Sequence, residues 1–219
     1  MPGLGDGSRG WRPYEPGRPQ TYAGPKRPVA KPVITPDVTL GRNVVIPHPE
    51  LVNLYGCRIG DGCKIASFVE IQRGVVLGKN VKVEAFAFIP TGVTIEDGAF
   101  IGPHVCFTND RYPRAVSDDG EQLGSDDWQV VPTLVKRGAA IGANATIVCG
   151  HTLGAYCFIA AGAMVTRDVP AYALMMGSPA RRVGWMSRAG ARLGANLVCP
   201  LDGRRYREAA PDTLVEIEE

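Results

Sequence analysis

Apolar residues recur at every sixth position of this chain between residues 59 and 107. The positions are Ile59, Ile65, Ile71, Leu77, Val83, Ile89, Ile95, Ile101 and Phe107. Four residues after each of the first eight comes a small or β-branched apolar residue: Cys63, Val69, Val75, Val81, Ala87, Val93, Ala99 and Val105. A helix repeats about every 3.6 residues and an amphipathic strand every two, so neither explains this spacing. A hexapeptide β-helix does, because each hexad forms one flat side of a triangular coil and turns its first residue inward.

The same repeat extends on both sides of this stretch. It begins at Ile34, Leu40 and Ile46, and it returns at Val135, Ile141, Ile147, Leu153, Ile159 and Val165. The spacing from Ile46 to Ile59 is one residue longer than two hexads, so we expect a bulged corner near residues 47–49. Together the hexads predict an all-β parallel β-helix of about six coils, at three hexads per coil.

The repeat also divides the chain into parts. Residues 1–32 are rich in Pro, Gly and Arg without periodicity, and we expect a flexible arm there. Residues 33–170 form the β-helix domain, with a loop at 108–134. Residues 171–219 follow as a C-terminal segment, because each end of a coil must be capped. Within it we expect a short helix over 183–193 and a hairpin over 197–208 that turns at Asp202-Gly203.

Composition excludes several classes of function. A net charge of +2 without a basic run does not predict nucleic-acid binding. An apolar run near 18 residues and a charged-then-apolar leader are both missing, so we expect a cytoplasmic protein without a membrane span. The six cysteines have no metal-binding spacing, and Cys63 and Cys157 occupy inward positions of the repeat, where reduced thiols act as small hydrophobic groups.

The long interruption of the repeat, residues 107–133, is where we expect function. It reads FTNDRYPRAVSDDGEQLGSDDWQVVPT, which is too long for a coil corner and too polar for a core. Arg114 follows a proline that stiffens its backbone, so its guanidinium is suited to clamp a phosphate or a carboxylate of a substrate. Trp128 can stack on a substrate ring or anchor the loop on a wall of the coil, and anchoring is the commoner role of a large aromatic residue.

Three segments together resemble one family of enzymes. They are FTNDRYPRA, PTLVKRGAAIGANATIVCG and GAMVTRDVPAYALMMGSPARRVGWMS. The chain resembles, over residues 34–208, the hexapeptide-repeat N-acetyltransferases of nucleotide-linked amino sugars. The nearest groups are the UDP-2-acetamido-3-amino-2,3-dideoxyglucuronate and dTDP-3-amino-sugar N-acetyltransferases. The resemblance implies a left-handed parallel β-helix, a homotrimer with active sites between subunits and acetyl-CoA as donor. We expect the product to serve polysaccharide biosynthesis or a glycosylated metabolite.

The resemblance also implies a catalytic role for Asn109, the asparagine of the family's F-T-N motif. Its amide would hold the reacting amine or donate to the developing oxyanion, unless it makes only a local turn hydrogen bond. A neutral amine is already a good nucleophile, so the enzyme mainly has to align it with the thioester. The resemblance implies that the departing CoA thiolate takes the proton. His104 is the alternative general base, and such a base would suit an O-acetyltransferase.

Residues for the coenzyme follow from the same resemblance. Lys136, Arg137, Arg181 and Arg182 would neutralise the phosphates of CoA, and Gly142 and Ala143 leave backbone amides open at a corner. Gly177 and Pro179 belong to the segment that closes around the coenzyme in the family. The alternative is a solvated charge cluster with turn glycines.

The acceptor is predicted less sharply. Glu70, Gln72 and Glu84 lie on consecutive coils and are placed to reach a sugar or a pyrimidine base. Glu84-Ala85-Phe86 replaces an amide-rich run of the uronate enzymes, so a uronate and a 3-amino deoxy sugar, on UDP or dTDP, both stay open.

The histidines argue against a competing metalloenzyme. A γ-type carbonic anhydrase shares the coil but needs three histidines on zinc, two of them closely spaced. Here His48, His104 and His151 lie far apart in the chain, and we expect no metal. We expect His48 on the surface and His151 as a neutral, hydrogen-bonded core residue. A purely structural β-helix would leave the long loop without a purpose.

Overall fold

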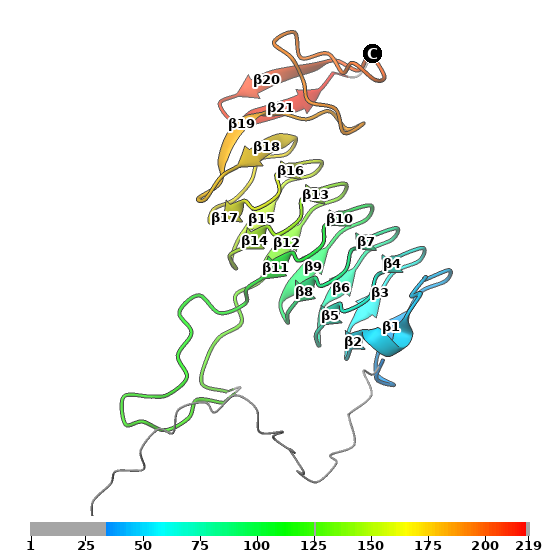
Figure 1. Cartoon of the computed structure of the whole chain (residues 1–219). Helices are drawn as coiled ribbons and strands as arrows, with labels where there is room; N and C mark the ends of the chain where they lie inside the picture. The colour runs from blue at the N-terminus through cyan, green and yellow to red at the C-terminus, as the bar shows by residue number, and fades with distance from the viewer. Residues whose placement is uncertain (1–33, 125, 218–219) are drawn as a thin grey trace, which may run out of the picture. The chain divides into compact units, whose positions relative to one another are not determined.

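A computed structural model of the chain describes residues 34–124 and 126–217, which form an all-β parallel β-helix (Figure 1). Short strands stack along the coil in three sheets of six, seven and six strands, here named wall 1, wall 2 and wall 3. From β2 to β17, successive strands of the chain fall on successive walls, so each circuit of the coil visits all three. The fold predicted from the six-residue repeat is confirmed, and it is the architecture expected of a left-handed β-helix.

The strands of each wall are very short. Wall 1 contains β1 (Thr39–Leu40), β3 (Arg58–Ile59), β6 (Val76–Leu77), β9 (Val93–Ile95), β12 (Thr133–Val135) and β15 (Thr152–Leu153). Wall 2 contains β4 (Lys64–Ile65), β7 (Lys82–Val83), β10 (Phe100–Ile101), β13 (Ala140–Ile141), β16 (Phe158–Ile159), β18 (Ala173–Met176) and β19 (Arg181–Trp185). Wall 3 contains β2 (Asn53–Leu54), β5 (Glu70–Ile71), β8 (Phe88–Ile89), β11 (Cys106–Phe107), β14 (Thr146–Ile147) and β17 (Met164–Val165).

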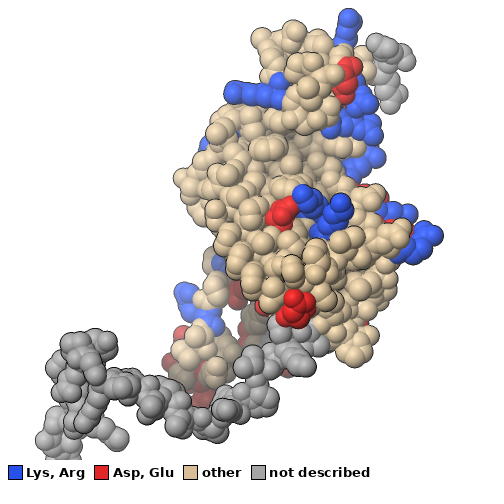
Figure 2. Space-filling view, turned by 45° about the vertical axis from the view of Figure 1, so that its right-hand side comes forward, with Lys and Arg blue, Asp and Glu red and all other residues tan. Residues whose placement is uncertain are grey.

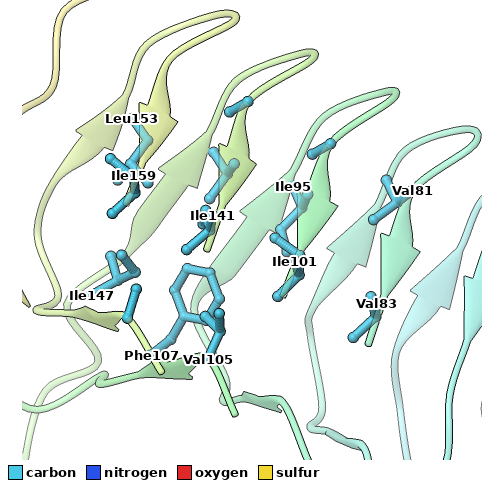
Figure 3. Packing of buried hydrophobic residues seen from close by; sticks show 14 of the residues in the cluster. Val81, Val83, Ile95, Ile101, Val105, Phe107, Ile141, Ile147, Leu153 and Ile159 are labelled. Atoms are coloured by element: carbon cyan, nitrogen blue, oxygen red, sulfur yellow. The ribbon is translucent and has the colours of Figure 1, made fainter. Parts of the chain in front are cut away.

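The register places the first residue of each hexad directly above its equivalent in the coil below. Ile65 pairs with Val83 on wall 2, and Val83 pairs with Ile101. Their side chains point into the core, where those labelled in Figure 3 lie in rows along the coil. From Ile59 to Val165 each such side chain is almost wholly buried, which stabilises the fold by roughly 1.5–3 kcal/mol per large residue, whereas Leu40 in the first strand is 43% exposed.

Most corners turn through one residue with left-handed backbone. Between walls 1 and 2 these residues include Gly62, Asn80 and Gly98, with φ of 71°, 55° and 69°. Gly and Asn tolerate this conformation at least cost, which is why they recur at this position of the repeat.

The irregular corner expected near residues 47–49 is confirmed. A short 3-10 helix, η1 (Pro49–Leu51), takes up the extra residue. Directly after it, Leu54 becomes fully buried and pairs with Ile71 on wall 3. The six-residue count had not singled out Leu54, because η1 shifts the inward position at this corner.

The C-terminal segment corrects one prediction. The short helix expected over 183–193 is not formed, because residues 181–185 are the strand β19, which pairs antiparallel with β18 at the end of wall 2. The turn at Asp202-Gly203 is confirmed by the Cys199 N–H, which donates to the Arg204 carbonyl at 2.8 Å. A second hairpin, β20 (Tyr206–Ala210) and β21 (Thr213–Glu216), follows it.

A stack of tyrosines joins this segment to the coil. The Tyr172 ring lies 5.4 Å from Tyr156, one coil earlier, and 5.4 Å from Tyr206 of β20. The guanidinium of Arg188 lies 5.3 Å from the Tyr156 ring centre, and that of Arg137 lies 5.8 Å from it. These ring and cation–π contacts cover the last coil, so a cap is present although it is built from strands.

The arm predicted at residues 1–32 lies outside the described residues. Among the residues that are described, none belongs to a helix with the length and apolar character needed to cross a membrane.

Candidate functional site

The long loop leaves the coil between β11 and β12, at the corner where wall 3 meets wall 1 (Figure 1). Its base is closed by the Val131 N–H, which donates to the Asn109 carbonyl at 2.9 Å. The Cys149 N–H donates to Thr108 Oγ1 at 3.0 Å and ties the same point to the next coil. Phe107, fully buried in the core, fixes the residue before the loop (Figure 3). Asn109 is therefore held on a rigid base.

Beyond this base the loop folds on itself around an open hollow of about 670 Å³. A turn at residues 117–121 forms its tip, where the Ser117 N–H donates to the Glu121 carbonyl at 2.8 Å. Arg114 and Trp128 both line the hollow. The structure thus brings together the two loop residues singled out from the sequence, and it adds Arg111 and Tyr112, which the sequence analysis did not select.

The two candidate catalytic residues are not brought together within one chain. His104 lies at the corner between walls 2 and 3, before β11, whereas Asn109 lies at the corner after it. The strand β11 lies between them, and five residues can separate their backbones by at most about 16 Å, at ~3.3 Å per residue. His104 and Asn109 therefore mark two different corners of the same coil.

His104 is part of a ring stack along its corner. Its imidazole lies 4.6 Å from the Phe86 ring at an interplanar angle of 4°, and Phe86 lies 4.7 Å from Phe68. All three have left-handed backbone, with φ between 57° and 63°, although bulky residues seldom adopt it. Both phenylalanines are about half exposed. The sequence carried a signal for this stack, since the three residues are spaced at eighteen, one full coil.

The predicted acceptor residues lie beside this corner. On wall 3, Glu70 accepts hydrogen bonds from Tyr55 Oη at 3.3 Å and from Gln72 Nε2 at 2.9 Å. Burial, and then the Glu70 charge, raises the pKa of Tyr55, so its hydroxyl stays a donor. Glu84 instead follows β7 of wall 2 and pairs with Lys82 at 2.8 Å. Both donors reach Oε1 of Glu70, and together they fix the position of its carboxylate. The charge of Glu84 is instead compensated by Lys82.

The predicted coenzyme residues fall on two different corners. Gly142 and Ala143 lie between β13 and β14, above Pro103 and His104, and the Gly162 N–H donates to the Ala143 carbonyl. Gly177 and Pro179 close the turn between β18 and β19, and the Met164 N–H donates to the Gly177 carbonyl at 3.0 Å. Both groups therefore follow the corner between walls 2 and 3.

Lys136 and Arg137 lie on the other side of wall 2, at the corner between β12 and β13. The Arg137 N–H donates to Glu96 Oε2 at 2.9 Å, and its guanidinium faces Tyr156. These two cations therefore lie at a different corner from Gly142, Ala143, Gly177 and Pro179.

The two arginines of β19 differ. Arg182 pairs with Asp212 at 2.7 Å and lies 4.1 Å over the Trp185 ring, so the C-terminal hairpin engages it. Arg181 is exposed and donates only to its neighbouring Ala180 carbonyl. In the view of Figure 2, basic side chains gather toward the C-terminal end of the coil, while much of the coil surface carries no charge. The guanidinium of Arg181 is therefore less engaged than that of Arg182.

The remaining histidines do not form a metal site. His48 is exposed and lies 3.3 Å from Glu50, as expected for a surface residue. His151 is mostly buried; its Nδ1 lies 3.5 Å from Asp168 Oδ1, and its Nε2 has no hydrogen-bond partner among the described residues. Within those residues no group of three or more His, Cys, Asp or Glu side chains is arranged to hold a metal ion.

The comparison with protein families identifies the repeat. Residues 74–109 match the family described as bacterial transferase hexapeptide (six repeats). Residues 56–89 and 137–167 match the hexapeptide repeat of succinyl-transferase. These segments of the coil are similar to transferase hexapeptide repeats. The matched segments lie on both sides of the loop, so the loop is an insertion into this repeat.

Two curated relatives extend the comparison to named enzymes. The chain is 45% identical over 80 residues to the dTDP-3-amino-3,6-dideoxy-alpha-D-galactopyranose 3-N-acetyltransferase of Aneurinibacillus thermoaerophilus, covering 35% of this chain and 41% of that protein. It is 33% identical over 145 residues to the bifunctional protein GlmU of Heliobacterium modesticaldum, covering 63% of this chain and 30% of that protein. The chain thus spans less than half the length of either relative. The first confirms the resemblance to nucleotide-sugar N-acetyltransferases.

A solved structure supports the fold. A mutant of AntD, an N-acyltransferase from Bacillus cereus in complex with dTDP and coenzyme A, matches with a TM-score of 0.55 at 17% identity. The match covers 69% of this chain and 85% of that one. At this identity the likeness establishes the β-helix alone.

Proposed function

We propose that this chain is an acetyl-CoA-dependent N-acetyltransferase that acts on the amino group, at C3, of a UDP- or dTDP-linked amino sugar. The observation that carries the proposal is the 45% identity over 80 residues to an enzyme named for that reaction on a dTDP sugar. The transferase hexapeptide repeats and the loop that begins at Asn109 support it.

In this mechanism the neutral amine attacks the thioester carbonyl directly. A new C–N bond forms, the C–S bond breaks, and the departing CoA thiolate takes the proton of the amine. Asn109 orients the amine or donates its amide N–H to the oxyanion, and the rigid base of the loop holds it in place. The site then needs no acid–base residue beside the amine.

The coenzyme, in this proposal, follows the corner between walls 2 and 3. The small residues Gly142 and Ala143 leave room for the pantetheine arm, and Gly177, Pro179 and Arg181 meet its phosphate end. Lys136 and Arg137 lie on another corner, so a second subunit supplies them.

A homotrimer would complete the site. The loop leaves its own coil at Asn109, and the flat walls of three parallel coils can pack together. Asn109 of one subunit would then face the His104 corner of the next.

The test is a panel of UDP- and dTDP-linked 3-amino and 4-amino sugars with acetyl-CoA, in which thiol release reports turnover. We expect turnover on a 3-amino sugar, and NMR of the product should place the acetyl group on that nitrogen. Thiol release without an acetylated sugar is the control for thioester hydrolysis. If no amino sugar in the panel is acetylated, the proposal is wrong.

A second candidate is an O-acetyltransferase that uses His104 as general base. The specific observation in its favour is that His104 is exposed, while the Phe86 ring fixes its orientation. Amine chemistry predicts that His104→Ala loses less than about threefold in kcat. Hydroxyl chemistry predicts a loss of about a hundredfold or more, together with the acidic limb of the pH profile.

A further inference from the structure

The hollow inside the long loop carries charges and rings that the mechanism above does not use. Its volume is about 670 Å³, and its lining includes Arg111, Tyr112, Arg114 and Trp128. The hollow begins at Asp110, the residue directly after Asn109. Whatever it binds is therefore next to the point where the reacting group is held.

The two arginines have no carboxylate partner, although the loop is acidic. Among residues 34–124 and 126–217, neither guanidinium forms an ion pair within 4.0 Å. The two carboxylates that line the hollow serve backbone turns instead. Asp110 Oδ1 accepts from the Tyr112 N–H at 2.8 Å, and Asp127 Oδ2 accepts from the Gly124 N–H at 2.7 Å. The positive charges of Arg111 and Arg114 are therefore available to bind an anionic ligand.

Arg111 lies at the base of the hollow, against the coil. A Cβ atom built on Gly150 would come within 3.6 Å of Arg111 Nη1 and 2.9 Å of Val131 Cγ1. The missing side chain at Gly150 therefore lets the guanidinium and the returning strand of the loop lie close to the coil. Arg114 Nη1 donates to the Pro113 carbonyl at 3.0 Å, and the other N–H groups of this guanidinium can donate to a ligand.

The rings supply the second half of a binding site. Trp128 is partly buried in the lining, and Tyr112 is 78% exposed. A guanidinium holds a phosphate by two parallel hydrogen bonds, and an indole face stacks on a base. A hollow with both is suited to a nucleoside diphosphate.

We propose that this hollow binds the nucleoside diphosphate of the acceptor substrate. Arg111 and Arg114 hold the diphosphate, Trp128 stacks on the pyrimidine, and the attached sugar extends toward Asn109. CoA also contains a nucleoside diphosphate, but its corner in the proposed function lies between walls 2 and 3, away from the loop. The sugar part of this inference rests on the proposed function, whereas the nucleotide part is tested independently.

The experiment is calorimetric titration of the full chain with dTDP, UDP, thymidine and CoA in turn. Arg111→Gln and Arg114→Gln should each raise the Kd for dTDP or UDP by about tenfold or more, because each removes a charge-assisted contact. Trp128→Leu should raise it by about fivefold or more. The Kd for CoA should stay within about twofold. Arg207→Gln, at an exposed position of β20, is the matched control and should change neither the Kd for dTDP or UDP nor the Kd for CoA.

Two further measurements make the result decisive. Arg114→Lys keeps the positive charge but loses the paired N–H donors of the guanidinium, so its affinity for dTDP or UDP should lie between those of Arg114→Gln and the parent chain. The Tm of every variant should match that of the parent chain. The inference is overturned if dTDP and UDP do not bind, if the variants bind them as the parent does, or if the variants lose CoA instead. Nucleotide binding that depends on these residues, without acetylation of any amino sugar, would sink the proposed function and leave this inference standing.

Discussion

The coil and the long loop use their residues in opposite ways. In the coil, nearly every side chain at an inward position is buried against its equivalent in the next coil, and the polar groups of the backbone are paired from coil to coil. In the loop, Arg111, Tyr112 and Arg114 are exposed around a hollow. The coil therefore carries the stability of the molecule, and the loop carries residues that stability does not require. Changes in the two regions should have separable effects.

The largest effect should come from the core at the base of the loop. Phe107→Ala removes a fully buried ring and should lower the free energy of unfolding by about 3–5 kcal/mol. Tyr112→Ala, in the loop, should change it by less than about 0.5 kcal/mol. Urea denaturation at a fixed protein concentration measures both. A loss below about 1 kcal/mol for Phe107→Ala would mean that the core there can collapse around the gap.

The next effect separates activity from stability. Asn109→Ala should lower kcat by about a hundredfold, with a smaller change in KM, because its amide acts mainly in the transition state. Unfolding should be unchanged, since the hydrogen bond that closes the loop uses the Asn109 backbone carbonyl. Gln122→Ala, at an exposed position of the same loop outside the hollow, is the control for steady-state kinetics. A parent-like kcat in Asn109→Ala would leave this residue with only a local role.

A smaller effect tests the exposed rings of the coil. Phe86→Leu should cost about 1 kcal/mol of stability, because it keeps the left-handed backbone and loses two ring contacts. Phe86→Asn should cost less, since Asn tolerates that backbone better. Thermal unfolding of the pair measures the difference. The reverse order would show that apolar contact, and not backbone strain, governs this corner.

The smallest effect concerns thiol reactivity. Burial raises the pKa of Cys157 to about 12, so very little of this thiol is ionised at pH 8. Iodoacetamide should leave Cys157 unlabelled in the folded protein and label it in denaturant, as peptide mapping can show. Val116→Cys, at an exposed loop position, should label at once. Rapid labelling of Cys157 would reveal that the coil opens locally.

Much of the coil could be predicted from the sequence, because the same local rule applies at each hexad. An inward Ile or Val at every sixth residue can be buried only if successive hexads stack. The exception at Leu54 has a physical reason, since η1 displaces the inward position by an amount that the count alone does not give. The C-terminal prediction was wrong for residues 183–193, because the open edge of β18 offers hydrogen bonds that outweigh a weak helix preference.

The candidate site was predicted as a set of residues, but their grouping was not. His104 and Asn109 are close in sequence and lie on different corners, and Lys136 and Gly142 are likewise divided by wall 2. The opposite occurs for Phe68, Phe86 and His104, which are distant in sequence and stacked in space. Each coil takes eighteen residues to return to the same corner, so nearness along the chain is a poor guide here.

The sequence by itself determined the β-helix, the place of its interruption and the residues that begin the loop, because a repeated burial pattern has one stacked solution. Only the tertiary structure decided that Arg111 and Arg114 share a hollow with Trp128, that Arg182 is held by the C-terminal hairpin, and that strands cap the coil. Those outcomes depend on contacts between segments that no local period relates, and such contacts exist only once the chain has folded.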